Sequence, residues 1–162
     1  MIVKGLTKSM PVRTAAVVAG AMVVALAGGR AMASDTILTA ALGDEVLQLI
    51  EDQPKVTRIV VNEKTVFEDR ESHTVAFYNA YQVQGRWMVL FQHEGDAKDC
   101  PARYRVLDLS GPAPRMSLPF GTCSKEPEVA TADGVLTVSM PNPAGGPAAS
   151  WTYRDGRISR TR

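Results

Sequence analysis

The residue types in this sequence that suit chemistry are two cysteines, two histidines and one acidic segment. The two cysteines, Cys100 and Cys123, lie far apart in the chain, which excludes a C-x-x-C redox pair. Two thiols alone do not complete a zinc site either. Two cysteines of one small domain in an oxidising compartment are expected to pair. We therefore predict a structural disulfide between Cys100 and Cys123, with two independent buried thiols as the alternative.

The acidic segment, residues 92–100, reads QHEGDAKDC. Its weak candidates for metal ligands are His93, Asp96 and Asp99, because imidazole and carboxylate groups bind zinc or a hard cation. The segment lacks the D-x-[DN]-x-[DN]-G calcium loop, and Lys98 lies among the acids. We favour a solvated loop after a buried strand and predict no metal. A small hydrolase or metal-dependent enzyme centred on His93 is an alternative.

Nucleophilic catalysis has little support in the sequence. A Ser-His-Asp triad would require His73 or His93. The loop serines Ser110 and Ser124 do not lie in a G-x-S-x-G motif. We predict no catalytic residues and no cofactor, so the chain is more typical of a protein without enzymatic activity.

The best candidate for a partner-binding patch lies near the C-terminus. Trp151, Tyr153 and Arg154 follow a Pro/Gly/Ala-rich stretch, PNPAGGPAAS, and Tyr, Trp and Arg are enriched at interface hot spots. Arg115, in a proline-rich segment, is the fourth predicted contact residue. For the two aromatic residues we favour burial in the core, because large aromatic side chains dominate the cores of small β domains.

The first 33 residues have the pattern of a secretory signal peptide. Three basic residues and no acid occur in residues 1–13, residues 14–29 carry no charge, and Ala31-Met32-Ala33 is an A-x-A cleavage site. The apolar run is shorter than the roughly 20 residues that a membrane span needs. We predict cleavage after Ala33 and a mature chain that is periplasmic or secreted. A retained signal anchor is the alternative.

Cleavage would change the net charge. The leader holds four of the 18 basic residues and none of the 17 acidic ones, so the mature net charge would be −3 in place of +1. No uniformly basic face is evident, which argues against nucleic acid as a partner. The expected partner is a protein of the cell envelope, and the mature chain is not expected to span the membrane.

Residues 34–162 are predicted to form a single β-rich domain. Short apolar or alternating runs are separated by turn signals, and Asp133-Gly134 and Asp155-Gly156 are typical of two-residue hairpin turns. The fold class is therefore all-β, or mainly β with one short N-terminal helix, and the expected architecture is a small antiparallel sandwich or barrel stapled by one disulfide. The predicted strands are 56–61, 65–69, 73–83, 86–92, 104–109, 129–132, 135–140, 150–153 and 157–159.

Three regions carry sharper expectations. Residues 34–55 are the only helix candidate, and a short helix followed by a strand over 46–50 is the alternative. Strand 73–83 places Val75, Phe77, Tyr81 and Val83 on one face at period two. Strand 86–92 is apolar almost without a break, which indicates a strand covered on both faces. No repeat of 20 to 50 residues is visible.

The proline-rich segment 110–121, SGPAPRMSLPFG, cannot pair with a sheet throughout its length, because proline donates no ladder hydrogen bond. We expect the disulfide to restrain it. A stiff scaffold that presents such a loop suits a small exported binding protein. The sequence thus favours a periplasmic inhibitor or immunity-type protein with a partner such as a cell-wall hydrolase. An accessory subunit of an envelope or secretion complex is the alternative.

Overall fold

The computed structural model describes residues 34–52, 55–95, 98 and 100–162, and the predicted signal peptide lies outside these residues. The described residues form twelve β-strands and no helix. Within them, no helix has the length and apolarity needed to cross a membrane. The strands are β1 Ser34–Leu42, β2 Glu45–Asp52, β3 Val56–Val61, β4 Lys64–Asp69, β5 Thr74–Val83, β6 Arg86–Glu94, β7 Arg103–Asp108, β8 Arg115–Met116, β9 Glu128–Ala132, β10 Val135–Met140, β11 Ala149–Arg154 and β12 Arg157–Arg160.

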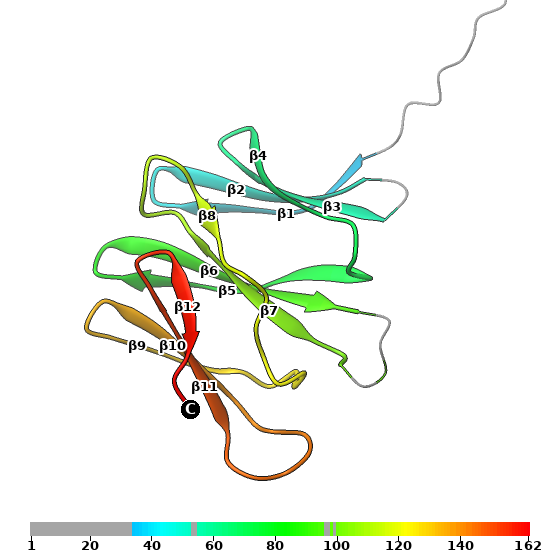
Figure 1. The fold of residues 1–162 in the computed structure, drawn as a ribbon. Coiled ribbons are helices and arrows are strands. Elements are labelled where there is room, and N and C mark those ends of the chain that lie inside the picture. Colours follow the sequence, from blue (N-terminus) through cyan, green and yellow to red (C-terminus); the bar gives the residue numbers. More distant parts are fainter. Residues whose placement is uncertain (1–33, 53–54, 96–97, 99) are drawn as a thin grey trace, which may run out of the picture. The chain divides into compact units, whose positions relative to one another are not determined.

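The strands form three four-stranded sheets, and each sheet uses four strands that are consecutive in the chain (Figure 1). Sheet A has the order β1-β2-β3-β4, sheet B has β5-β6-β7-β8, and sheet C has β12-β11-β10-β9. The paired strands are antiparallel in all three sheets. The all-β antiparallel prediction is confirmed. The sheets remain open and stack as layers in chain order, with sheet B in the middle.

Two hydrophobic cores fill the spaces between the layers. Residues of sheets A and B build one core, and residues of sheets B and C build the other. Sheet B therefore buries both of its faces, whereas sheets A and C each bury one. The buried residues of the A–B core are Leu42, Leu47, Leu49, Ile59, Val61, Val75, Val89, Phe91, Leu107 and Leu109. Those of the B–C core are Val83, Met88, Leu90, Ala102, Tyr104, Val106, Phe120, Leu136, Val138, Met140, Ala149, Trp151 and Tyr153.

Strand β6 shows why sheet B lies in the middle. Successive side chains of a strand point to opposite faces. In β6, Val89 and Phe91 enter the A–B core, and Met88 and Leu90 enter the B–C core. All four are fully buried. The prediction of a strand covered on both faces is confirmed.

The Asp-Gly hairpin turns form where the sequence predicts them. Asp133 and Gly134 have φ values of 50° and 74°, and they join β9 to β10. Asp155 and Gly156, with φ values of 49° and 83°, join β11 to β12. Both central residues therefore have positive φ, which matches the right-handed twist of the flanking strands.

The predicted N-terminal helix is wrong in both its long and its short form, and only the strand over 46–50 is correct. Strands β1 and β2 form an antiparallel hairpin through Gly43 and Asp44, and Gly43 has a φ of 66°. Leu47 and Leu49 alternate into the A–B core at the spacing of a strand. The apolar residues of this segment satisfy a period near 3.6 and a period of 2 about equally. The neighbouring sheet decides between them because it offers a flat apolar face.

The expectation that four residues of β5 share one face is also wrong. A β-bulge lies between Phe77 and Asn79, so Tyr78 has no partner in β6. The extra residue inverts the alternation. Val75 and Phe77 consequently pack toward sheet A, whereas Tyr81 and Val83 pack toward sheet C.

Candidate partner-binding site

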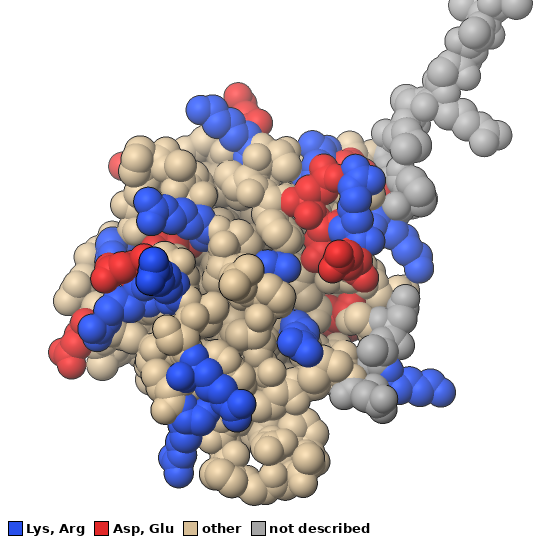
Figure 2. Space-filling model, viewed as in Figure 1, with Lys and Arg blue, Asp and Glu red and all other residues tan. Residues whose placement is uncertain are grey.

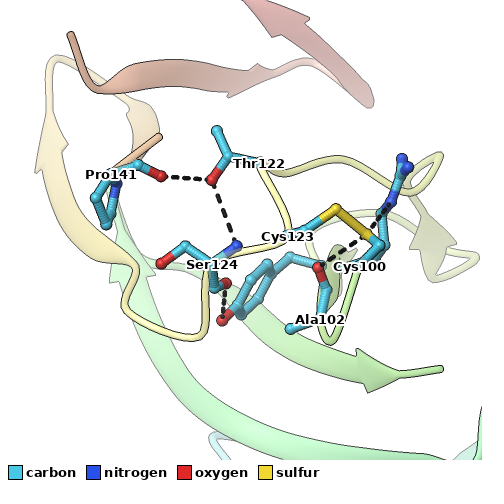
Figure 3. The surroundings of a disulfide bond; sticks show 8 residues. Cys100, Ala102, Thr122, Cys123, Ser124 and Pro141 are labelled. Atoms are coloured by element: carbon cyan, nitrogen blue, oxygen red, sulfur yellow. Dashed lines mark hydrogen bonds between the residues drawn. A yellow bond between two sulfur atoms is a disulfide. The ribbon is translucent and has the colours of Figure 1, made fainter. Parts of the chain in front are cut away.

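The predicted disulfide between Cys100 and Cys123 is formed (Figure 3). It joins the ends of a wide hairpin made by β7 and the segment that returns along it. Asp108 pairs with Arg115 at one end of this hairpin, and an isolated bridge pairs Tyr104 with Phe120 further along. The register shifts by one residue between these two pairs, and Cys100 and Cys123 lie beyond the bridge, with 4.6 Å between their Cα atoms. The disulfide thus extends the hairpin beyond its last hydrogen-bonded pair.

The return segment is held to β7 by backbone pairing that is interrupted along its length. The Ser117 N–H donates to the Val106 carbonyl at 2.8 Å, and the buried Ser117 Oγ accepts from the Val106 N–H at 2.9 Å. Immediately before Cys123, Thr122 donates through Oγ1 to the Pro141 carbonyl at 2.7 Å (Figure 3). The proline-rich segment is therefore fastened at the sheet, at the disulfide and at the end of β10.

The loop between β7 and β8 is organised by the carboxylate of Asp108, which is buried. Its Oδ1 accepts from the Ser110 N–H at 2.8 Å, and its Oδ2 accepts from the Tyr153 hydroxyl at 3.1 Å. Burial raises the pKa of Tyr153, and the negative charge of Asp108 raises it further, so the phenol keeps its proton and donates it. The start of the loop is thereby tied to sheet C.

This loop and the β11–β12 turn enclose a hollow of about 210 Å³. Arg115 is placed against the turn, because a Cβ added at Gly156 would lie 3.2 Å from an Nη atom of Arg115. Arg86 also lines the hollow, and its Nη2 donates to the Gly134 carbonyl at 3.4 Å. The lining residues are Arg86, Asp108, Ser110, Gly111, Ala113, Arg115, Asp155 and Gly156.

The lining of this hollow holds two arginines and two aspartates, and further arginines lie beside it. Figure 2 shows basic side chains along β12 and around the turn that leads into it. Arg154 and Arg157 flank that turn and are exposed. Neither Arg86 nor Arg115 forms an ion pair with a described residue. We call the hollow together with these four arginines the loop site.

The structure buries two of the four predicted partner-binding residues and exposes the other two. Trp151 is 8% exposed and Tyr153 is 0% exposed, so both are core residues, as the favoured interpretation had it. Trp151 packs on Phe120 with 5.7 Å between the ring centroids. Of the predicted patch only Arg154 and Arg115 remain on the surface, because sheet C turns its aromatic residues toward sheet B.

The residues that sequence reasoning missed are Arg86 and Asp108. Arg86 follows a hairpin turn at the start of β6, and Asp108 ends β7. Neither belongs to a motif, and both are distant in sequence from the β11–β12 turn. The sequence offers no signal that would group them.

Of the predicted metal-binding or catalytic candidates, the structure describes only His93. His93 lies in β6 and is buried, whereas Asp96 and Asp99 lie outside the described residues. The Nδ1 of His93 is 2.9 Å from Asp69 Oδ2 and 3.3 Å from Ser72 Oγ. Because serine and aspartate both lie on the Nδ1 side, the arrangement is not that of a catalytic triad, whose serine faces Nε2. No group of three or more potential metal ligands occurs among the described residues.

The Tyr153–Asp108 hydrogen bond gives a first prediction. Tyr153→Phe should lower the free energy of unfolding by about 1–3 kcal/mol, because it leaves a buried carboxylate with one donor fewer. Urea denaturation measures the loss. Tyr78→Phe is the control, since the Tyr78 hydroxyl bonds the Pro127 carbonyl at 3.2 Å from an exposed position. Equal losses in the two variants would contradict the prediction.

His93 gives a prediction about pH. Burial lowers the pKa of His93, with a smaller contribution from the charge of Arg105, and the hydrogen bond to Asp69 only partly opposes this. The unfolded chain therefore binds a proton more readily than the folded one. Stability should be highest above the ordinary histidine pKa of about 6.5 and should fall as the pH drops below it. Asp69, whose pKa is lowered, contributes a further loss only at more acidic pH.

Thermal unfolding between pH 7.5 and pH 5 tests this expectation. His93→Gln should flatten the dependence of the melting temperature on pH. A wild-type melting temperature that does not change over this range would contradict the assignment of a neutral His93.

Comparisons with known proteins do not identify this chain. No family model matches the sequence, no curated protein matches it, and no solved structure matches the fold.

Proposed function

We propose that the chain is a small exported binding protein without enzymatic activity. Its role is that of a periplasmic inhibitor or immunity-type protein, and its partner is another protein of the cell envelope, such as a cell-wall hydrolase. The loop site carries this proposal, because the proline-rich loop, two arginines of sheet B and the β11–β12 turn of sheet C meet at one hollow. The disulfide supports an exported location, since such bonds persist in oxidising compartments.

The loop site suits an acidic partner surface. Guanidinium groups bind carboxylates with two parallel hydrogen bonds, and they are enriched at the energetic centres of interfaces. A hydrolase that cleaves glycosidic bonds carries a pair of carboxylates in its cleft. A loop flanked by arginines is complementary in charge to such a cleft.

The test begins with affinity capture from periplasm, followed by an assay of the captured enzyme. The protein should block that enzyme at a one-to-one ratio. The double variant Arg115→Glu with Arg154→Glu should weaken association at least about tenfold, because like charges then face the partner. Arg70→Glu is a control, since Arg70 is an exposed arginine next to β4 in sheet A.

Two outcomes would reject the proposal. One is a partner whose affinity is the same for the wild type and the charge-reversal variant. The other is migration of the protein within a large envelope complex without inhibition of an enzyme, which is the behaviour of an accessory subunit.

A further inference from the structure

Sheet C packs on sheet B with its inner face, and no other described sheet covers its outer face. Residues that are paired directly across antiparallel strands lie on the same face, so the pairings of β9 to β12 define the outer face. Its charged residues are Glu128, Arg154 and Arg157. Between these charges lie small side chains, which are Ala130, Thr137, Ser139, Ser150, Thr152 and Ser159.

The opposite charges of the outer face stand at opposite corners. Glu128 begins β9 at the end of the sheet where Ser139 pairs with Ser150. Arg154 and Arg157 pair with each other at the other end, beside the β11–β12 turn. All three charged residues are exposed, and none forms an ion pair with a described residue. By strand geometry the two corners are about 10–14 Å apart across the strands and about 13 Å apart along them.

The acidic corner opens into a hollow of about 510 Å³, whose lining includes Glu126 and Glu128. A residue that precedes proline is extended, so these two side chains, on either side of Pro127, point the same way. Tyr78, the bulge residue of β5, also lines the hollow and is 40% exposed. Its hydroxyl donates to the Pro127 carbonyl at 3.2 Å, which fixes the ring. Two carboxylates and an aromatic ring are groups that bind a guanidinium.

The basic residue in the described lining of this hollow is already paired. Lys125 Nζ lies 2.6 Å from Glu94 Oε1. Glu126 is exposed and, like Glu128, forms no ion pair with a described residue. Residues 100–162, which carry the whole of sheet C, are described without a gap. The acidic corner therefore has two uncompensated carboxylates, and the basic corner has two uncompensated guanidinium groups.

We propose that two copies of this chain form a symmetric dimer through the outer faces of their C sheets. A two-fold axis in the interface, perpendicular to the line between the corners, places the arginines of each copy on the acidic hollow of the other. That line runs at about 45° to the strands, so the strands of the two copies cross at about a right angle. Orthogonal packing is one of the two arrangements in which sheets stack face to face. The small side chains between the corners allow the close approach.

The same geometry identifies the residue nearest the axis. Thr137 lies in β10, the neighbour of β9, and is two residues from Ser139 at the acidic end. It is also two residues from Val135, which is level with Arg154 at the basic end. Thr137 is therefore about halfway between the corners and faces Thr137 of the second copy.

Sedimentation velocity of the purified protein is the first measurement. At low salt the protein should be in equilibrium between monomer and dimer. The dissociation constant should rise at least about tenfold between about 0.01 M and about 1 M salt, because the Debye length falls from about 30 Å to about 3 Å.

Charge reversal is the second measurement. Glu126→Arg with Glu128→Arg, and separately Arg154→Glu with Arg157→Glu, should each raise the dissociation constant at least about tenfold at low salt, because like charges then face each other. An equimolar mixture of the two variants should form a heterodimer, since every reversed corner then meets its complement. All four residues are exposed, so the melting temperature of the monomer should not change.

Thr137→Arg tests the position of the axis. It brings two like charges together at the centre of the interface and should abolish the dimer, although it leaves both corners intact. The matched control is Thr39→Arg, which changes an exposed threonine of β1 in sheet A and should leave the dimer unchanged.

The proposal is wrong if the protein stays monomeric at low salt and about 1 mM concentration. It is also wrong if the dimer survives Thr137→Arg or either charge reversal, or if the mixed reversal variants do not associate. The result does not depend on the proposed function, because the measurement uses only this chain. Glu126 and Glu128 are not loop-site residues, so loss of the dimer and loss of partner binding are distinguishable.

Discussion

Replacing both cysteines, Cys100→Ala with Cys123→Ala, is expected to lower the free energy of unfolding by about 2–4 kcal/mol. The bond closes a loop that contains β7, β8 and the proline-rich segment between them. Without it, the unfolded chain gains conformational entropy. The return segment would keep only its broken pairing with β7, in which Leu118 and Pro119 are exposed.

The loss of stability should be uneven across the molecule. Cys123 has a φ of 72°, a backbone conformation that residues other than glycine rarely adopt, and the disulfide helps to hold it. We expect hydrogen exchange to accelerate first in residues 115–124 and later in sheet A. Urea denaturation gives the total loss. Ser124→Ala, next to the bond, is the control and should change stability far less. A double variant as stable as the wild type would show that the disulfide contributes nothing.

The second large effect concerns two neighbouring residues of β6. Leu90→Ala is expected to lower the free energy of unfolding by about 2–5 kcal/mol, and Phe91→Ala by about 3–5 kcal/mol. In a sheet with one covered face, two successive residues do not both lose this much. Here Leu90 packs toward sheet C and Phe91 toward sheet A, and both are 0% exposed.

Denaturant unfolding of the two variants therefore tests the three-layer architecture. The control is Ile37→Ala, because Ile37 falls at a register shift in β1 and is 53% exposed. It should change stability by no more than about 0.5 kcal/mol. If only one of the two β6 variants is destabilised, sheet B has a solvent-exposed face and the architecture is wrong.

Some features were predictable because they depend on interactions between residues that are close in the sequence. An Asp-Gly pair adopts positive φ at both positions whatever surrounds it, so Asp133-Gly134 and Asp155-Gly156 form turns as expected. The unbroken apolar run of β6 already implies two covered faces. Pairing of the only two cysteines needed no knowledge of the fold beyond a shared domain.

Features that depend on an extra residue or on a distant strand were not predictable. The bulge at Tyr78 inverts the faces of β5, and nothing in the local sequence marks it. The helix expected near the N-terminus became a hairpin because sheet B covers one face of sheet A. The three sheets repeat one meander although the sequence shows no repeat, since each sheet faces different neighbours and therefore needs different side chains.

The sequence by itself determined the strand-rich class, the hairpin turns, the disulfide and the absence of a recognisable catalytic motif. Only the tertiary structure decided that Trp151 and Tyr153 are buried, that Arg86 and Arg115 border one hollow, and that His93 meets Asp69 across two sheets. The physical reason is the range of the interactions. Turn conformations and alternation depend on adjacent residues, whereas both sites are assembled from strands that only the stacking of three separate sheets brings together.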